Sequence, residues 1–192
     1  METKSIMIVG VGGQGTLLAS RLLGAALLSE NYDVKVSEVH GMSQRGGSVV
    51  TYVKYGEEVF SPIVREGQAD FILAFEQLEA ARWLPFLKKG GTIIANSQKI
   101  DPMPVVIGNA QYPDGVLEAI RATGSDLVEA DALSLAVEAG SPKAVNVVLI
   151  GVMASRMDLP YTVWEKAIRV TVPEKFLEMN LRAFKLGFES AK

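Results

Sequence analysis

The 192-residue sequence contains no cysteine and a single histidine, His40. Without thiolates the chain forms no disulfide, no cysteine-ligated zinc site and no iron–sulfur cluster of the ordinary kind, because the ligands of such centres are thiolates. One imidazole likewise excludes a site with several histidine ligands. We therefore expect any redox chemistry to come from a bound organic cofactor or from another chain.

The sequence also has no large excess of charge of either sign and no long apolar run. The 19 Lys and Arg residues nearly balance the 22 Asp and Glu residues, so there is no electrostatic reason to expect nucleic acid or an anionic membrane as a partner. No apolar run approaches the roughly 20 residues that span a bilayer. Residues 1–4 lead into a predicted strand without the features of a signal peptide. We expect a soluble cytoplasmic protein.

Short apolar runs alternate with helical patterns along the chain. The runs predict strands over residues 5–9, 33–37, 69–74, 92–95 and 126–130. Residues 47–55, rich in Val, Thr and Tyr, predict a hairpin with residues 59–60, so the sheet is expected to be mixed. The whole pattern predicts a three-layer α/β/α Rossmann-like fold with a mostly parallel, mixed sheet and a helical C-terminal region, in one domain over residues 1–192.

Finer patterns in the second half predict local structure. Residues 105–107 predict a brief strand. The spacing of Thr162 and Glu165, and of Thr171 and Glu174, is that of capping boxes, which predicts the starts of the last two helices. Two apolar surfaces are either core or partner-binding surfaces: the helix predicted over residues 144–157, and a face of the last helix with Leu177, Leu181, Phe184 and Phe188.

The most informative segment is a glycine-rich turn between the first predicted strand and the first predicted helix. Its sequence is Gly10-Val11-Gly12-Gly13-Gln14-Gly15. Glycines let the backbone turn sharply and approach a phosphate closely, and free N–H groups at a helix start attract the anion. The segment therefore predicts a nucleotide- or phosphate-binding turn. The alternative is a tight turn that only serves packing.

A second loop, after the strand predicted over residues 33–37, concentrates chemically active groups. It reads Glu38-Val39-His40-Gly41-Met42-Ser43-Gln44-Arg45-Gly46-Gly47. Loops at the carboxyl ends of parallel strands converge on one crevice, so we expect this loop beside the glycine turn. Arg45 is suited to a bidentate contact with phosphate or carboxylate, and Gly46 and Gly47 let N–H groups face the same anion. Alternatively, Arg45 pairs with Glu38, and His40 serves as a structural hydrogen-bonding residue.

The two loops together provide the candidate ligand-binding residues. No residue is predicted to be catalytic or to bind a metal. The candidates for cofactor binding are Gly10, Gly12, Gly13, Gln14, Gly15, His40, Ser43, Gln44, Arg45, Gly46 and Gly47.

The two loops resemble those of the gamma-type subunits of 2-oxoacid:ferredoxin oxidoreductases, most of all the small (beta) subunit type of the indolepyruvate enzymes. The likeness extends along nearly the whole chain. It includes residues 69–76, residues 146–151, and Asn180, Ala183 and Gly187 near the C-terminus. The loop at residues 40–47 carries more of the resemblance than the glycine turn, because many folds share such turns.

This resemblance implies a multisubunit enzyme that converts a 2-oxoacid and coenzyme A to acyl-CoA, CO2 and reduced ferredoxin. Thiamine diphosphate, Mg2+ and 4Fe–4S clusters are implied to lie on a larger partner subunit, with no cofactor bound by this chain alone. The implied partners are that larger subunit and, through the complex, ferredoxin. The resemblance leaves open whether the chain also forms a homodimer. The chain is not expected to be active alone. Its two loops either hold coenzyme A or dock the partner subunit.

Two other functions stay open from the residues. In the first, the chain is a free-standing nicotinamide-binding enzyme, because Glu38 lies about 20 residues beyond the glycine turn, where an acidic ribose contact is expected. In the second, it is a non-catalytic interaction module with an empty glycine turn. Binding of NADH would favour the first, and a lack of affinity for any nucleotide, coenzyme A or phosphate the second.

Overall fold

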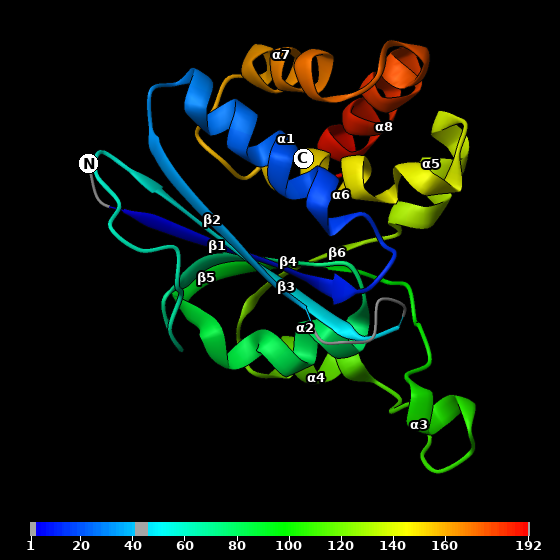
Figure 1. The fold of residues 1–192 in the computed structure, drawn as a ribbon. Coiled ribbons are helices and arrows are strands. Elements are labelled where there is room, and N and C mark those ends of the chain that lie inside the picture. Colours follow the sequence, from blue (N-terminus) through cyan, green and yellow to red (C-terminus); the bar gives the residue numbers. More distant parts are fainter. Residues whose placement is uncertain (1–2, 41–45, 192) are drawn as a thin grey trace.

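A six-stranded sheet separates two helical layers (Figure 1). The computed structural model describes residues 3–40 and 46–191. The strands lie in the order β2-β3-β1-β4-β5-β6, and their bounds are β1 Lys4–Val11, β2 Asp33–His40, β3 Ser48–Gly56, β4 Ala69–Ala74, β5 Leu87–Asn96 and β6 Asp126–Ala130. β3 runs antiparallel to both of its neighbours, whereas β1, β4, β5 and β6 pair in parallel. The prediction of a mostly parallel, mixed sheet is confirmed.

Helices cover both faces of this sheet. α1, α5, α6, α7 and α8 lie on one face, α2 and α4 lie on the other, and α3 projects away from the body (Figure 1). Their bounds are α1 Thr16–Ser29, α2 Gln77–Trp83, α3 Met103–Val106, α4 Val116–Ala122, α5 Ala132–Ala139, α6 Val145–Ala154, α7 Tyr161–Thr171 and α8 Leu177–Ser190. None of the helices in the described ranges is long and apolar enough to cross a membrane.

Each face of the sheet has its own apolar core. Along β1, Ile6 and Ile8 face the core under α1, α6 and α8, while Met7 and Val9 face the core under α2 and α4. This alternation follows from the two-residue period of a strand. Because both faces are covered, β1 is an almost continuous apolar run, as expected for a central strand.

Of the two apolar surfaces, α6 is core, whereas the face of α8 packs on the core with Phe184 buried and Leu177, Leu181 and Phe188 partly buried. All ten residues of α6 are buried, and Phe184 of α8 is fully buried. The two helices cross at a pair of glycines: a Cβ on Gly151 would lie 2.2 Å from the carbonyl oxygen of Phe184, and one on Gly187 would lie 2.1 Å from that of Val148. Only glycine permits this backbone approach.

The structure corrects the predicted hairpin. β3 pairs with β2 and β1, not with residues 59–60. After Gly56 the chain leaves the sheet, and the Val59 N–H donates to the side-chain carboxylate of Asp33 (2.8 Å) rather than to the backbone of a strand. Alternation alone indicated a strand but not its partner, since pairing depends on distant residues.

The predicted strand at residues 105–107 is also wrong, because this segment begins within α3. Proline is well suited to the first turn of a helix, since its φ is preset and its missing N–H is not needed there. Pro102 and Pro104 occupy this turn, and the Pro102 carbonyl accepts from the N–H of Val105 (2.8 Å). The two prolines therefore outweighed the β-branched side chains.

Both predicted capping boxes are wrong for a related reason. α7 begins at Tyr161 directly after Pro160, so Thr162 lies inside its first turn. α7 continues to Thr171, and α8 begins only at Leu177 after a short 3-10 turn. The prolines set these helix starts, and the Thr–Glu spacing was coincidental.

Candidate functional site

The glycine turn joins the end of β1 to the start of α1, as predicted. Gly13 (φ +100°) and Gly15 (φ +82°) adopt left-handed backbone conformations that L-residues rarely take. Gly10 is needed for space instead, because a Cβ there would lie 2.8 Å from the Gln14 side-chain oxygen and 3.0 Å from the Phe75 Cβ. The turn therefore requires glycine at three positions for two different reasons.

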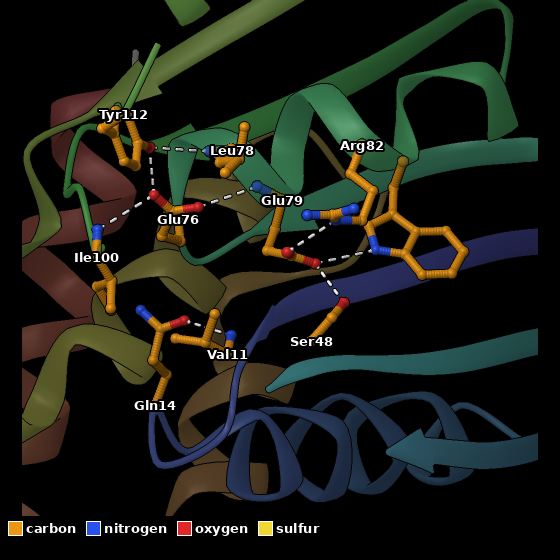
Figure 2. A network of polar contacts seen from close by, with 10 residues as sticks. Val11, Gln14, Ser48, Glu76, Leu78, Glu79, Arg82, Ile100 and Tyr112 are labelled. Atoms are coloured by element: carbon orange, nitrogen blue, oxygen red, sulfur yellow. Dashed lines mark hydrogen bonds and ion pairs between the residues drawn. The ribbon is translucent and has the colours of Figure 1, made fainter. Parts of the chain in front are cut away.

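The Gln14 amide braces the turn from inside. Its Oε1 accepts from the Val11 N–H (2.8 Å), and its Nε2 donates to the Phe75 carbonyl (2.9 Å) at the end of β4. Figure 2 shows the first of these contacts. On the other side, the buried Asn146 of α6 donates to the Gly15 carbonyl (3.2 Å). Residues from three elements thus fix the shape of the turn.

The turn presents backbone N–H groups at the start of α1. Within residues 3–40 and 46–191, no protein acceptor binds the N–H of Gly13, Gly15 or Thr16, and no side chain caps α1. Among the described residues, no heavy atom would lie within 4 Å of a Cβ at Gly13, so none of them fills the space above it. Unpaired donors at a helix N-terminus suit an oxyanion.

The described ends of the second loop lie beside the glycine turn, where the sequence predicted the loop. The Gly12 N–H donates to the Gly47 carbonyl (2.9 Å), and Ser48 faces Val11 in the β1–β3 register. His40, at the other end of the loop, closes β2 opposite Val49. The remaining candidates Ser43, Gln44 and Arg45 lie outside the described residues. The ends of both predicted loops therefore converge at one edge of the sheet.

A cavity of about 310 Å³ opens between these two segments. Its lining combines the glycine turn and the start of α1 with the ends of β2 and β3: Gly12, Gly13, Gly15, Thr16, Leu17, Glu38, His40 and Val49. Its acidic member, Glu38, accepts a hydrogen bond from the Thr51 hydroxyl (3.2 Å). A carboxylate here favours a hydroxyl-bearing group over a second anion.

A second cavity of about 420 Å³ lies at the same turn but involves different elements. It is lined by Gly13, Gln14, Gly15, Gln98, Ile100, Leu133, Pro142, Lys143 and Val145. Sequence reasoning missed Gln98 and Lys143, because they stand in connections without a recognisable motif. The one available signal was topological and applies to Gln98 alone: it follows β5, whose carboxyl end lies at the edge where β1 ends.

Two buried glutamates of the α2 region hold the neighbouring segments in place (Figure 2). Glu76 is 1% exposed, and its Oε1 accepts from the Ile100 N–H (3.2 Å) and from the Tyr112 hydroxyl. Its Oε2 accepts from the Glu79 N–H (3.0 Å) and so caps α2. Burial, together with the bond to Glu76, raises the pKa of the Tyr112 hydroxyl above its usual range.

Glu79 anchors the second loop in the same way. Its Oε1 pairs with Arg82 Nε (3.0 Å), and its Oε2 accepts from the Trp83 indole N–H (3.2 Å) and from the Ser48 hydroxyl. Ser48 follows Gly47 directly, so this carboxylate fixes the end of the loop at residues 41–47. Neither glutamate was singled out from the sequence, because the contacts depend on segments 24 to 36 residues away.

Across the described ranges, no cluster of His, Asp and Glu is arranged to hold a metal ion. What the site offers is a set of backbone donors between two cavities, one with a carboxylate and one with an ammonium group. This arrangement suits an extended ligand with a central anionic group.

Comparisons with known proteins, by sequence and by structure, both find oxidoreductase subunits. Residues 5–190 match the family described as pyruvate ferredoxin/flavodoxin oxidoreductase. The chain is 45% identical over 197 residues to "Indolepyruvate oxidoreductase subunit IorB" of Thermococcus kodakarensis, covering 100% of this chain and 98% of the relative. It is 31% identical to "Ketoisovalerate oxidoreductase subunit VorA" of Methanothermobacter thermautotrophicus, where the match covers 97% of this chain but 36% of the longer relative.

Among solved structures, the fold is similar to that of a keto/oxoacid ferredoxin oxidoreductase gamma subunit from Geobacter sulfurreducens. The TM-score is 0.73 with 27% sequence identity, over 98% of each chain. The predicted α/β fold is therefore shared with a gamma subunit along its whole length.

Proposed function

This chain belongs to the pyruvate ferredoxin/flavodoxin oxidoreductase family, and we propose that it is the small subunit of an oxidoreductase that acts on indolepyruvate or a related aryl 2-oxoacid. The end-to-end 45% identity to an indolepyruvate oxidoreductase subunit carries this proposal. The assembled enzyme converts the 2-oxoacid and coenzyme A to acyl-CoA and CO2, and passes two electrons to ferredoxin.

The chemistry that breaks the carbon–carbon bond is proposed to lie on a larger partner subunit. Thiamine diphosphate, held there with Mg2+, supplies the carbanion-stabilising chemistry, and 4Fe–4S clusters carry the electrons. This chain has no cysteine, so it provides none of the thiolates that hold such clusters. Its own contribution is a binding and docking surface.

We propose that the glycine turn holds the pyrophosphate of coenzyme A. The N–H groups of Gly13, Gly15 and Thr16, which have no acceptor within residues 3–40 and 46–191, support this role, because backbone donors at a helix N-terminus attract an oxyanion. Cavities of about 310 and 420 Å³ on the two sides give the rest of an extended ligand room to continue. Arg45 is the proposed cation, with Gly46 and Gly47 adding backbone donors.

The rest of the predicted site has supporting roles in this proposal. Gly10 and Gln14 shape the turn rather than reach the ligand, since both Gln14 polar atoms already bind the main chain. His40 lines the smaller cavity. Ser43 and Gln44 are proposed to face the same ligand or the partner subunit.

A nicotinamide dinucleotide is the second candidate ligand, because Glu38 lines the smaller cavity beside the glycine turn. An acidic side chain at this point suits a ribose hydroxyl. Titration of the chain with NADH, followed by Trp83 and Trp164 fluorescence, tests it. Micromolar binding would support this function over the first.

Two experiments test the main proposal. When this chain is produced together with its larger subunit, we expect ferredoxin reduction that depends on both indolepyruvate and coenzyme A, and no activity from the isolated chain. Turnover by the isolated chain would contradict the proposal. In the complex, Arg45→Ala is expected to weaken coenzyme A binding by about 1–3 kcal/mol, the range for a charge-assisted hydrogen bond, and unchanged affinity would remove Arg45 from the site.

A further inference from the structure

Residues 101–111, called the arm below, form a projection that exposes three large apolar side chains. The arm contains α3 and extends well beyond the two helical layers (Figure 1). Met103, Val106 and Ile107 are 67%, 66% and 60% exposed. No charged residue occurs from residue 102 to residue 113. The three side chains stand at i, i+3 and i+4 spacing, and contiguous exposed apolar patches mark interaction sites.

The arm is an ordered structure and not a frayed loop. The Pro102 carbonyl accepts from the N–H of Val105 and Val106 (2.8 and 3.1 Å), and the Pro104 carbonyl accepts from those of Asn109 and Ala110 (2.8 and 3.0 Å). These bonds satisfy the backbone inside the arm while the apolar side chains point outward. Their exposure is therefore a property of the folded arm.

The base of the arm is fixed to the site at both ends. Glu76 accepts from the Ile100 N–H just before the arm and from the Tyr112 hydroxyl just after it (Figure 2). Lys99 lies over the Tyr112 ring, 5.5 Å from its centroid. The carbonyl next to Glu76, that of Phe75, is the one that Gln14 of the glycine turn binds. The arm and the glycine turn thus share one support.

We propose that the arm inserts into an uncharged apolar groove of the larger subunit, and this inference rests on the proposed function. The tip, residues 103–110, is far smaller than the roughly 20–30 residues per side of a standard interface. Contact between the tips of two copies would therefore be too small to hold a dimer. A partner that holds the arm therefore needs further contact surface beside it.

The place of the arm also favours the larger subunit. Ile100, at the base of the arm, lines the 420 Å³ cavity beside the glycine turn. A partner that holds the arm consequently lies against the mouth of this cavity and completes the ligand site. In a relative named a ketoisovalerate oxidoreductase subunit, the region matching this chain is 36% of a longer chain, so further sequence adjoins this fold there.

The test compares assembly of arm variants with the larger subunit. Val106→Asp places a negative charge and Ile107→Lys a positive charge on an exposed position of the arm. Both substitutions change side chains only, so the backbone hydrogen bonds of the arm are kept. The matched control is Phe60→Asp, because Phe60 is 87% exposed and follows β3 at the opposite edge of the sheet. Binding of each purified variant to the larger subunit is measured by calorimetry, with thermal unfolding of the isolated chain as the folding check.

We expect both arm variants to bind the larger subunit at least roughly tenfold more weakly than the wild-type chain, while Phe60→Asp binds within about twofold and all keep the wild-type unfolding temperature. Binding of the arm variants at wild-type strength would overturn the inference but leave the proposed function intact. Equal weakening of binding by Phe60→Asp would also overturn the inference. So would a self-associated form of the wild-type chain that both arm variants lose and Phe60→Asp keeps, because the arm would then contact a second copy. If the wild-type chain binds no larger subunit, both proposals fail.

Discussion

Replacing Gly15 by alanine tests whether the glycine turn has the geometry that the site requires. Gly15 has φ +82°, and a left-handed L-residue costs about 1–2 kcal/mol. The new Cβ would also lie 2.6 Å from Asn146 Nδ2, which donates to the Gly15 carbonyl. Displacing that amide removes a hydrogen bond worth about 0.5–1.5 kcal/mol. We therefore expect Gly15→Ala to lower the free energy of unfolding by about 2–3 kcal/mol.

The two contributions can be separated by a double-mutant cycle with Asn146→Ala. In that background the Cβ has no amide to displace, so Gly15→Ala should cost only the left-handed term of about 1–2 kcal/mol. The assay is urea unfolding of the isolated chain followed by tryptophan fluorescence. A loss below about 0.5 kcal/mol in the wild-type background would refute the argument, since that is smaller than the backbone term alone.

Further predictions concern the scaffold around the site. Gly151→Ala should lower the free energy of unfolding by more than about 3 kcal/mol, because the new Cβ would lie 2.2 Å from the Phe184 carbonyl oxygen. Gly24→Ala, which has open space in α1, should instead raise it by about 1 kcal/mol. Equal effects of the two variants in urea unfolding would contradict the helix-crossing argument. Asp131 is the N-cap of α5, and hydrogen bonds from Ser134 lower the pKa of its carboxyl group. The ionised carboxylate therefore stabilises the folded chain above pH 3.8, and this stabilisation is lost as the pH falls through the lowered pKa of the folded state. Asp131→Asn keeps the cap and should flatten the decline in stability below pH 4, and an unchanged decline would exclude Asp131 as its source.

The sequence was sufficient for features that depend on neighbouring residues. β1, the glycine turn and α1 follow each other within 30 residues, and the strands at Ala69–Ala74 and Asp126–Ala130 have the predicted bounds. Helix starts were less predictable, because at Pro160 and Pro173 a fixed φ decided what the Thr–Glu spacing did not.

Features that depend on distant contacts could not be read from the sequence. β3 alternates like any strand, but its place between β1 and β2 follows only from the assembled sheet. Glu76 and Glu79 look like ordinary surface residues at a helix start until their partners at Ser48, Ile100 and Tyr112 are known. Lys143 enters the site because the segment before α6 returns to the edge where β1 ends.

The central claim is that backbone N–H groups of the glycine turn bind the pyrophosphate of coenzyme A. The direct measurement is a coenzyme A titration of the 15N-labelled chain, followed by NMR of its amide groups. We predict that the largest saturable shifts occur at Gly13, Gly15 and Thr16, while the amides of Gly67 and Gly124, remote in the fold, stay unchanged. Shifts that leave those three amides unaffected, or no saturable shift at millimolar coenzyme A, would contradict the claim.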